Sequence, residues 1–251
     1  MLAMKFSVIT PCYNAGATIA RTLQSVAAQT HDDVEHIVMD GGSTDETAAI
    51  VEARIRVGGR FVSGPDQGMY DAMNKGLALA SGEIVGILNA DDHFADPDAL
   101  AWVAEAFATH GTDAVLCDVG FFSTRRPDRL FRRYRSVTFR PGRLAWGWMP
   151  AHPGMYMTRE AYLRVGTYRT DFRIAADYEF VVRAFVKHRL SFVHLPRVLV
   201  RMQAGGVSNR DLAAKSVINR EVLRACRENG VYSNAWMIAS KYPLKLLEYF
   251  R

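Results

Sequence analysis

The sequence predicts an α/β fold with a mostly parallel central sheet that helices cover on both faces. Over roughly the first 110 residues, short apolar runs alternate with segments of helical periodicity, a pattern typical of repeated strand–helix units. A polar loop follows each apolar run, at the position where open parallel sheets bind their ligands. The 251 residues are 49% apolar, which suffices for one sizeable core.

Four strand–helix units are expected in this region. In each, an apolar run precedes a helix whose apolar residues recur three to four positions apart. The predicted pairs are Lys5–Thr10 with Ala15–Gln29, Val34–Met39 with Asp45–Arg56, Phe61–Ser63 with Met69–Ala80, and Glu83–Leu88 with Pro97–His110. Because parallel strands end at one edge of a sheet, the four loops that follow these strands should lie together and form the ligand site.

The pattern changes after residue 113. We expect further strands at Asp113–Val119, Leu190–Val193 and Val198–Met202, and helices at Tyr156–Val165, Asp177–Lys187 and Leu212–Arg227. No repeat, low-complexity tract or flexible linker separates the two halves of the chain. The sequence therefore predicts a single compact domain at residues 1–210 and a helical extension at residues 211–251.

Charge is distributed unequally along the chain. Residues 1–120 hold 6 Lys and Arg against 17 Asp and Glu, a net of −11, which leaves 25 against 9, a net of +16, for the remainder. Such asymmetry indicates two surfaces with different partners. An acidic half would repel a nucleotide, so a bound cation is implied if that half binds one.

Cysteine usage and hydropathy bear on location. The three cysteines form no CxxC pair, so neither a disulfide framework nor a structural zinc site is expected, and a reducing cytoplasm fits best. No apolar run reaches the approximately 20 residues needed to span a bilayer. We expect a cytoplasmic protein that is soluble or peripheral on the inner face of the cell membrane.

Two adjacent carboxylates, Asp91 and Asp92, end the fourth apolar run. Neighbouring acids repel each other and are costly to place unless a cation is present. Oxygen ligands suit a hard metal, so the pair predicts a Mg²⁺ or Mn²⁺ ion that carries a diphosphate. A solvated loop, or a cap for the helix after Pro97, is the alternative.

The ordered set of loops resembles that of the inverting family 2 glycosyltransferases of GT-A-type fold. The matching stretches are Ser7–Asn14, Asp40–Asp45, Leu88–Asp92 and Ile174–Glu179. Two others, Asp66–Gly76 and His152–Gly154, resemble the branch that builds bacterial exopolysaccharides and glycolipids. The resemblance covers about residues 5–208, and the ordered set is more specific than any one motif. It implies a nucleotide-sugar and metal half at residues 1–120 and an acceptor half at residues 121–210.

On the donor side, the resemblance implies that Tyr13 stacks on the nucleobase, with the backbone of Thr10 and Pro11 beside it. An aromatic face suits a base, although a tyrosine at a strand end can equally pack in the core. The resemblance also implies that Asp40 contacts the base or the ribose, whereas a turn-forming role is the alternative. A common family pattern has a second acid where Gly41 stands, so the sequence does not specify uridine as the base.

The resemblance also assigns the acids of the reaction centre. It implies that Asp91 leans toward the ribose and the metal, and that Asp92 is the principal metal ligand. It further implies that Asp177 is the catalytic base, which takes the proton of the acceptor hydroxyl. Asp177 could instead only cap the following helix. A helix N-terminus lowers the pKa of a carboxylate, so a base that works near neutral pH would need desolvation.

Four further residues are weaker candidates. Asp66, Asn74 and Lys75 occupy the third loop and its helix, where they would reach the donor's sugar or phosphates, although Lys75 suits a solvated helix position as well. By resemblance, His152 borders the acceptor or the sugar. A packed histidine is an equally good interpretation of His152.

Two basic or apolar stretches concern the acceptor side. Aromatic residues are interleaved with eight arginines, which are Arg125, Arg126, Arg129, Arg132, Arg133, Arg135, Arg140 and Arg143. An anionic membrane surface or a lipid-diphosphate acceptor suits them better than nucleic acid, and an ordinary basic hairpin is the alternative. The apolar tail from Trp236 to Arg251 either contacts a membrane surface or another copy, or packs on the domain.

The leading hypothesis is a metal-dependent inverting glycosyltransferase. It would move a sugar from a nucleotide-diphosphate sugar to a hydroxyl of a glycan or glycolipid in the bacterial envelope or in exopolysaccharide synthesis. A sugar-1-phosphate nucleotidyltransferase is the second hypothesis, but the first loop lacks the basic, glycine-rich sequence expected of one. A non-catalytic nucleotide- or membrane-binding module is the third. The oligomeric state is not indicated.

Overall fold

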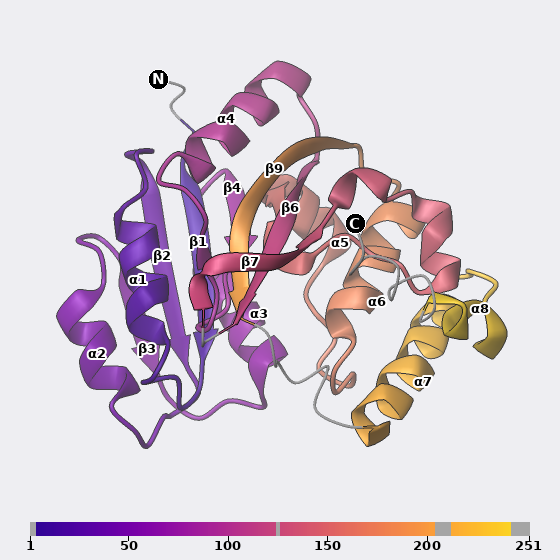
Figure 1. The fold of residues 1–251 in the computed structure, drawn as a ribbon, viewed down its shortest axis with the longest axis horizontal. Coiled ribbons are helices and arrows are strands. Elements are labelled where there is room, and N and C mark those ends of the chain that lie inside the picture. Colours follow the sequence, from indigo (N-terminus) through magenta and orange to yellow (C-terminus); the bar gives the residue numbers. More distant parts are fainter. Residues whose placement is uncertain (1–3, 124–125, 204–211, 242–251) are drawn as a thin grey trace.

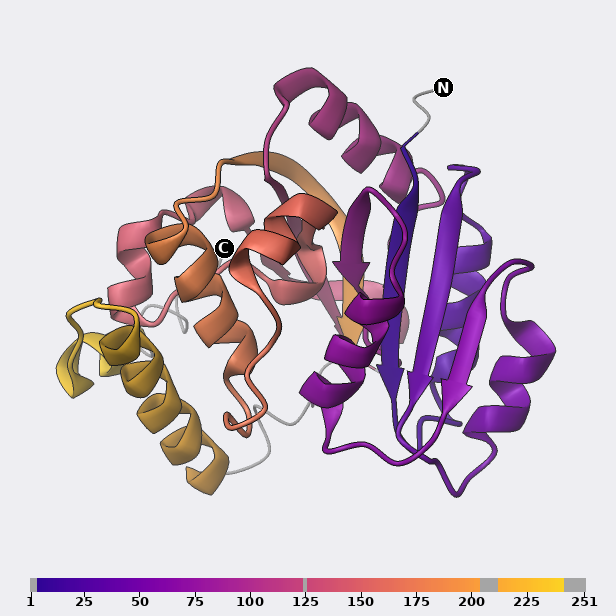
Figure 2. The ribbon, with the colours of Figure 1, turned by 180° about the vertical axis from the view of Figure 1, so that it is seen from behind.

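A computed structural model describes residues 4–123, 126–203 and 212–241. Its strands form one sheet in the order β3-β2-β1-β4-β8-β6-β9-β5, and β7 pairs with β6 beside this path. Helices cover both faces of the sheet (Figures 1 and 2). The α/β fold expected from the sequence is therefore confirmed.

Four strands form the parallel half of the sheet: β1 (Phe6–Cys12), β2 (Val34–Asp40), β3 (Arg60–Ser63) and β4 (Ile84–Ile87). β1 lies between β2 and β4, and β3 is at the edge. β1, β2 and β4 are buried along their whole length, as continuous apolar runs require when both faces of a sheet are covered. Their carboxyl ends meet at one edge, toward which the arrowheads point in Figure 2.

The helices divide between the two faces. α1 (Ile19–Ala27), α2 (Thr47–Arg54) and α4 (Ala99–His110) cover one face. α3 (Met69–Leu79), α5 (Arg159–Val165) and α6 (Ala176–Val182) cover the other. Val8 packs toward α1 and α4 while its neighbour Ile9 packs toward α3, because side chains alternate along a strand.

The second half of the sheet is mixed rather than parallel. β8 (Met155–Thr158) runs antiparallel to both β4 and β6 (Ala114–Ser123). β9 (Phe192–Gln203) runs parallel to β6, and the short β5 (His93–Phe94) runs antiparallel to β9. Parallel pairing is thus continuous only in β1–β4 and recurs once in the second half, between β6 and β9.

Two detailed predictions for this half were wrong. Residues 156–158 belong to β8 and not to a helix, which begins only at Arg159. The Tyr156 ring lies against Gly86 of β4, where a Cβ atom would be 2.2 Å from it, so packing across the sheet decided its conformation. Two short strands were expected near residues 190–202, but β9 is one strand that bulges at Pro196 and Arg197 opposite β6.

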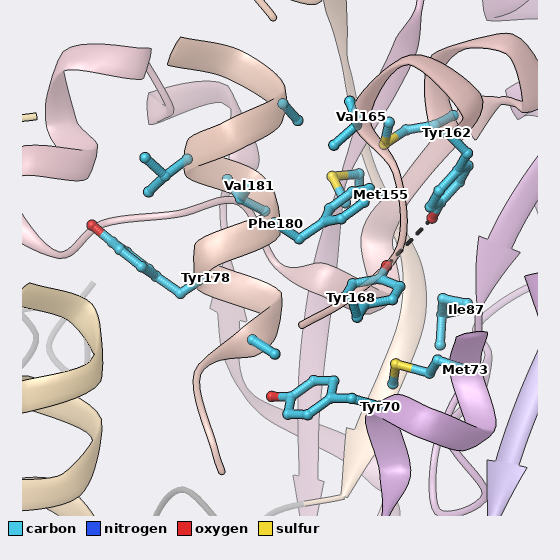
Figure 3. Packing of buried hydrophobic residues seen from close by; sticks show 14 of the residues in the cluster. Tyr70, Met73, Ile87, Met155, Tyr162, Val165, Tyr168, Tyr178, Phe180 and Val181 are labelled. Carbon is cyan, nitrogen blue, oxygen red and sulfur yellow. Dashed lines mark hydrogen bonds between the residues drawn. The ribbon is translucent and has the colours of Figure 1, made fainter. Parts of the chain in front are cut away.

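The core between α3, α5 and α6 is rich in aromatic rings. Tyr168 stacks on Phe180 of α6 with ring centroids 4.5 Å apart, and on Tyr70 of α3 at 6.1 Å. Figure 3 shows these three rings between the two helices, with Tyr162 close to the Tyr168 hydroxyl. This stack joins the donor half of the chain to the second half.

α7 (Leu212–Glu228) and α8 (Ala235–Ala239) follow the sheet. Val222, Ala225 and Cys226 of α7 are buried in the same core cluster as α6, and the two helices lie side by side in both views (Figures 1 and 2). The predicted domain boundary at residue 210 lies outside the described residues, and so do residues 242–251 of the apolar tail. Of the helices that the structure describes, none is long and apolar enough to cross a membrane.

The arginine-rich stretch contains a strand, β7 (Arg126–Tyr134), which forms an antiparallel hairpin with β6. Arg133 makes an ion pair with the buried Asp118 at 2.7 Å. Arg140 and Arg143 donate hydrogen bonds to backbone carbonyls of residues 137–139. The arginine-rich stretch therefore includes one strand of a β-hairpin, as the basic-hairpin alternative predicts. Arg133, Arg140 and Arg143 contact the protein itself and stabilise the fold. Arg125 lies outside the described residues.

Candidate active site

The loops after β1 and β2 are joined by hydrogen bonds. The Asn14 amide donates to the Ser43 hydroxyl at 2.8 Å, and the Thr44 amide donates to the Asn14 side chain at 2.9 Å. The Ala15 amide donates to the Thr47 hydroxyl at 2.8 Å. These bonds fix the loop on which the Tyr13 ring is 63% exposed, so Tyr13 is available for stacking and is not a core residue. Thr10 is fully buried, with its hydroxyl 2.9 Å from His36 Nε2, and Pro11 is buried as well, so neither residue is exposed to a ligand in this structure.

Asp40 ends β2 and is almost fully buried. Its carboxylate accepts hydrogen bonds from the amide and hydroxyl of Ser43 and, at 2.6 Å, from the hydroxyl of Ser63. Burial by itself raises the pKa of Asp40, but the hydrogen bonds from Ser43 and Ser63 outweigh it and the net pKa is lowered. Asp40 is therefore an ionised group that ties the ends of β2 and β3 together.

The Asp66 side chain lies against Gly41. A Cβ atom at residue 41 would be 2.6 Å from the Asp66 carboxylate. Asp66 also accepts a hydrogen bond from the Gly68 amide at 2.8 Å, which orients its side chain in the third loop. A carboxylate from the loop after β3 thus lies in the space that a side chain at residue 41 would enter.

Asp91 and Asp92 lie on a turn that α1 supports. The Thr22 hydroxyl donates to the carbonyl oxygens of Ala90 and Asp92, at 3.0 and 2.7 Å. The Asp92 carboxylate is 2% exposed and accepts hydrogen bonds from Asn89 at 3.1 Å and from the Gln203 amide of β9 at 3.3 Å. The Asp91 side chain is half-buried and is the more accessible of the two.

Electrostatics in this turn are unfavourable for two free carboxylates. Burial raises the pKa of Asp91, while burial and then the adjacent charge of Asp91 raise the pKa of Asp92 well above its ordinary value. Asn89 Oδ1 is buried without a hydrogen-bond partner. Two carboxylates and a vacant amide oxygen are a hard-oxygen donor set, so these residues fit a divalent cation such as Mg²⁺ or Mn²⁺. Asp91 and Asp92 are only a pair of acids, and the described residues contain no group of three or more acidic, His or Cys side chains arranged to hold a metal.

Asp177 is the second residue of α6, and Tyr70 of α3 connects it to the sheet edge. The Tyr70 hydroxyl donates to the Ile174 carbonyl at 2.5 Å and lies 3.3 Å from Asp177 Oδ1. The Tyr178 amide donates to the same oxygen at 2.8 Å. α3 begins at the carboxyl edge of the sheet directly after the Asp66 loop, so Tyr70 brings the Asp177 carboxylate to the edge that Asp40 and Asp66 occupy.

Burial raises the pKa of Asp177 to about 6, against the hydrogen bonds of Tyr178 and Tyr70 that lower it. The helix N-terminus therefore does not dominate, and desolvation exists before any substrate arrives. A carboxylate with a pKa of about 6 is ionised at neutral pH and is a stronger base than an ordinary aspartate.

Asn74, Lys75 and His152 have partners inside the protein. Asn74 exchanges two hydrogen bonds of 2.8 Å with the backbone of Tyr168, so its amide fixes the loop before α6. Lys75 forms an ion pair with Asp71 at 2.9 Å and donates to the Pro65 carbonyl. His152 is buried beside the Tyr168 hydroxyl at 2.8 Å, and burial lowers its pKa to about 4. This is the arrangement of a packed, neutral histidine.

Three side chains near the acids were not indicated by sequence patterns. Tyr70 contacts Asp177, Asn89 contacts Asp92, and Glu221 of α7 accepts hydrogen bonds from the loop before α6. Asn89 stands next to the Asp pair, so its spacing could have indicated a role. The partners of Tyr70 and Glu221 lie far away in sequence, and only the fold brings them together.

Comparison with known proteins identifies the family of this chain. Residues 7–166, more than half of the chain, match the profile of glycosyl transferase family 2. A PGL/p-HBAD biosynthesis glycosyltransferase of Mycobacterium bovis is 34% identical over 229 residues, which cover 89% of this chain and 84% of the relative. The chain therefore belongs to glycosyl transferase family 2. It is a glycosyltransferase, as the leading hypothesis from the sequence states.

Solved structures share the fold at low identity. The structure of S. aureus TarS 1-349 in complex with UDP-GlcNAc aligns with a TM-score of 0.70 at 20% identity, over 88% of this chain and 66% of that one. A mannosyltransferase, PcManGT from Pyrobaculum calidifontis, in complex with GDP-Man and Mn²⁺, aligns with a TM-score of 0.61 at 20% identity, over 97% of this chain and 81% of that one. Both alignments place this chain among GT-A glycosyltransferase folds.

Proposed function

We propose that this chain is a metal-dependent inverting glycosyltransferase that moves a sugar from a nucleotide-diphosphate sugar to a hydroxyl of a glycan or glycolipid. The observation that carries the proposal is the Asp177 carboxylate, whose pKa burial raises to about 6 beside the sheet edge where the donor loops end. Family membership supplies the reaction type, sugar transfer. The raised pKa of Asp177 supports a role for this carboxylate as the base.

On the donor side, Tyr13 would stack on the nucleobase from its exposed position. Asp66, oriented by the Gly68 amide, would accept a hydrogen bond from the base or the ribose. Asp40 would act mainly through the backbone that it fixes. Because TarS is named with UDP-GlcNAc and PcManGT with GDP-Man, the fold accepts more than one base, and we leave the base of this donor open.

Asp91 and Asp92 would hold the divalent cation, with Asn89 Oδ1 as a further oxygen. Mg²⁺ and Mn²⁺ sites are commonly completed by substrate phosphates, so two carboxylates from the protein are enough. When bound, the cation neutralises charge on the diphosphate leaving group. Asp91 has the more accessible carboxylate, and Asp92 is held behind it by Asn89 and Gln203.

Asp177 would take the proton from the acceptor hydroxyl. The acceptor oxygen then forms a bond to the anomeric carbon as the bond from that carbon to the diphosphate oxygen breaks, and attack from the opposite side inverts the anomeric configuration. The nucleoside diphosphate leaves with the electron pair. Tyr70 would orient the carboxylate through its hydroxyl. A single base suffices for an inverting transfer.

We propose a class of acceptor, a glycolipid, and not a particular molecule. The M. bovis relative is named for PGL/p-HBAD biosynthesis, which supports a glycolipid acceptor for this chain. By the resemblance, residues 1–120 would bind the donor and residues 121–210 the acceptor, with residues 211–251 as an extension. The protein would then bind an anionic membrane surface from the cytoplasmic side and contact the acceptor there.

Release of nucleoside diphosphate tests the function. The protein is incubated with UDP-, GDP- and dTDP-sugars, with Mn²⁺, with Mg²⁺ or with EDTA, and diphosphate release by slow hydrolysis is measured. We expect release from at least one donor in the presence of metal and its loss with EDTA. The absence of release from every donor would contradict the proposal.

A further inference from the structure

The segment between Tyr168 and Asp177 is held by one face of α7, which the sequence assigns to an extension of the domain. Glu221, Arg224 and Glu228 are spaced three and four residues apart, so their side chains lie on one side of the helix. In both views α7 runs alongside α6 (Figures 1 and 2). All three side chains contact the segment that precedes α6.

Glu221 contacts the backbone of this segment and not its side chains. Its half-buried carboxylate accepts hydrogen bonds from three consecutive backbone amides, those of Arg173 at 2.7 Å, Ile174 at 2.9 Å and Ala175 at 2.8 Å. Arg173 and Ile174 precede α6, and Ala175 is its N-cap, whose amide has no partner within the helix. An acid from another helix thus satisfies the three amides and fixes the angle at which α6 begins.

A second set of contacts holds the same segment further back. Arg169 and Arg224 each pair with both Asp171 and Glu228, in a closed group of four charges. The two guanidinium groups lie over the faces of the buried Phe172 ring, at 4.8 and 4.4 Å from its centroid. These charges are largely exposed, so each pair contributes little by itself. Glu221 is the member of this face that reaches the start of α6.

We propose that Glu221 is a positioning residue for the reaction, and that α7 is part of the active site's support and not an appended segment. The proposal rests on the proposed role of Asp177 as the base. Glu221 aligns the carboxylate of Asp177 by holding the Arg173–Ala175 backbone against α7, while Tyr70 holds the Ile174 carbonyl from the opposite side. Small misplacements of a catalytic group have large effects on rate.

Glu221 also acts on Asp177 through its charge. Three described groups from other segments face the Asp177 carboxylate: Tyr70 from α3, Tyr168 from the preceding segment and Glu221 from α7. Of these, Glu221 is the carboxylate, and its charge adds to burial in raising the pKa of Asp177. Removing that charge therefore lowers the pKa of the base.

The test compares Glu221→Gln with Glu228→Gln in the full chain. Glu228 lies on the same face of the same helix but does not contact residues 173–175, so it is a matched control. We expect Glu221→Gln to lower kcat by about tenfold or more with the donor KM changed less than about twofold, because alignment is lost but the donor site is intact. The acidic limb of its pH–rate profile should move to lower pH. Glu228→Gln should change neither, and Glu221→Asp should recover part of kcat.

Hydrogen exchange provides a readout that does not depend on catalysis. The amides of residues 173–175 should exchange faster in Glu221→Gln than in the wild type or in Glu228→Gln. Wild-type kcat, an unmoved acidic limb and unchanged exchange in Glu221→Gln would overturn the proposal. If Glu221→Gln does not fold by circular dichroism, Glu221→Asp is measured against the same criteria.

The outcome for the base is separate. Full turnover in Asp177→Asn would show that the proposed base is wrong, and the exchange measurement alone would then decide whether Glu221 orders the loop. If Asp177→Asn is inactive while Glu221→Gln behaves as Glu228→Gln does, the base stands and the positioning role of Glu221 is excluded.

Discussion

The donor edge and the proposed base are held in place in different ways. At the donor edge, neighbouring loops bond to one another, as in the Asn14–Ser43 hydrogen bond across 29 positions of sequence. The proposed base has partners 107 positions away for Tyr70–Asp177 and 47 for Glu221–Ile174, and the turn at Asp92 also has a remote partner, the Gln203 amide, 111 positions away. The loops after β1 and β2 are thus held by each other, whereas the environment of Asp177 depends on three packed helices. Substitutions at the two places should have different effects.

Asp177→Asn should have the largest effect. An amide cannot accept the acceptor's proton as a carboxylate does, so we expect transfer to fall about 10²- to 10⁴-fold. Donor affinity should be unchanged because the donor loops keep their own bonds. Transfer and donor binding are measured separately, by product formation and by titration calorimetry. Weakened donor binding would show that the two regions are not independent.

Asp91→Asn and Asp92→Asn should weaken metal-dependent donor binding by about tenfold or more, since each removes a charge that favours the cation. They should differ in stability. Asp92 is the more deeply buried of two like charges, so Asp92→Asn should raise the melting temperature of the metal-free protein more than Asp91→Asn does. Thermal melts with EDTA and with Mn²⁺ distinguish the two variants. Equal melting temperatures would contradict the assignment of Asp92 to the inner position.

Tyr13→Ala should raise the donor KM by about tenfold and leave kcat nearly unchanged, because a base–aromatic stack contributes about 1–3 kcal/mol to binding. The exposed ring contributes little to the core, so the melting temperature should not change. Steady-state kinetics with Tyr13→Phe as the matched control measures this, since phenylalanine keeps the ring. A similar loss in Tyr13→Phe would point to the hydroxyl and not to stacking.

The smallest expected effect is a pH-dependent difference in melting temperature between Asp177→Asn and the wild type. Burial raises the pKa of Asp177 from 3.8 to about 6 in the folded state, so the folded protein binds this proton more tightly and ionisation costs stability as pH rises through that window. Asp177→Asn should therefore melt a few degrees above the wild type at pH 7–8. Below pH 4 the difference should vanish. A constant difference at all pH values would mean that the raised pKa of Asp177 is not its cause.

The family, the strand–helix order of the first half and the positions of the acids were predictable from the sequence. Asp40, Asp91 and Asp92 each follow a buried strand or stand in the loop after it, and parallel pairing brings such loops to one edge. The strand at Met155–Thr158 was not predictable, because the contact of Tyr156 with Gly86 is made across the sheet. Nor could the sequence decide between a packed and an accessible His152, which depends on its bond to Tyr168.

The sequence by itself determined which acids this protein has and on which strand and helix ends they stand, since local periodicity and turn residues record that much. Only the tertiary structure decided the burial, the pKa values and the contacts of these acids. Burial sets the raised pKa of Asp177, Asp66 occupies the space beside Gly41, and the carboxylate of Glu221 caps the amides before α6. Desolvation and hydrogen bonds between remote segments exist only after the chain has packed, and for that reason no local pattern contains them.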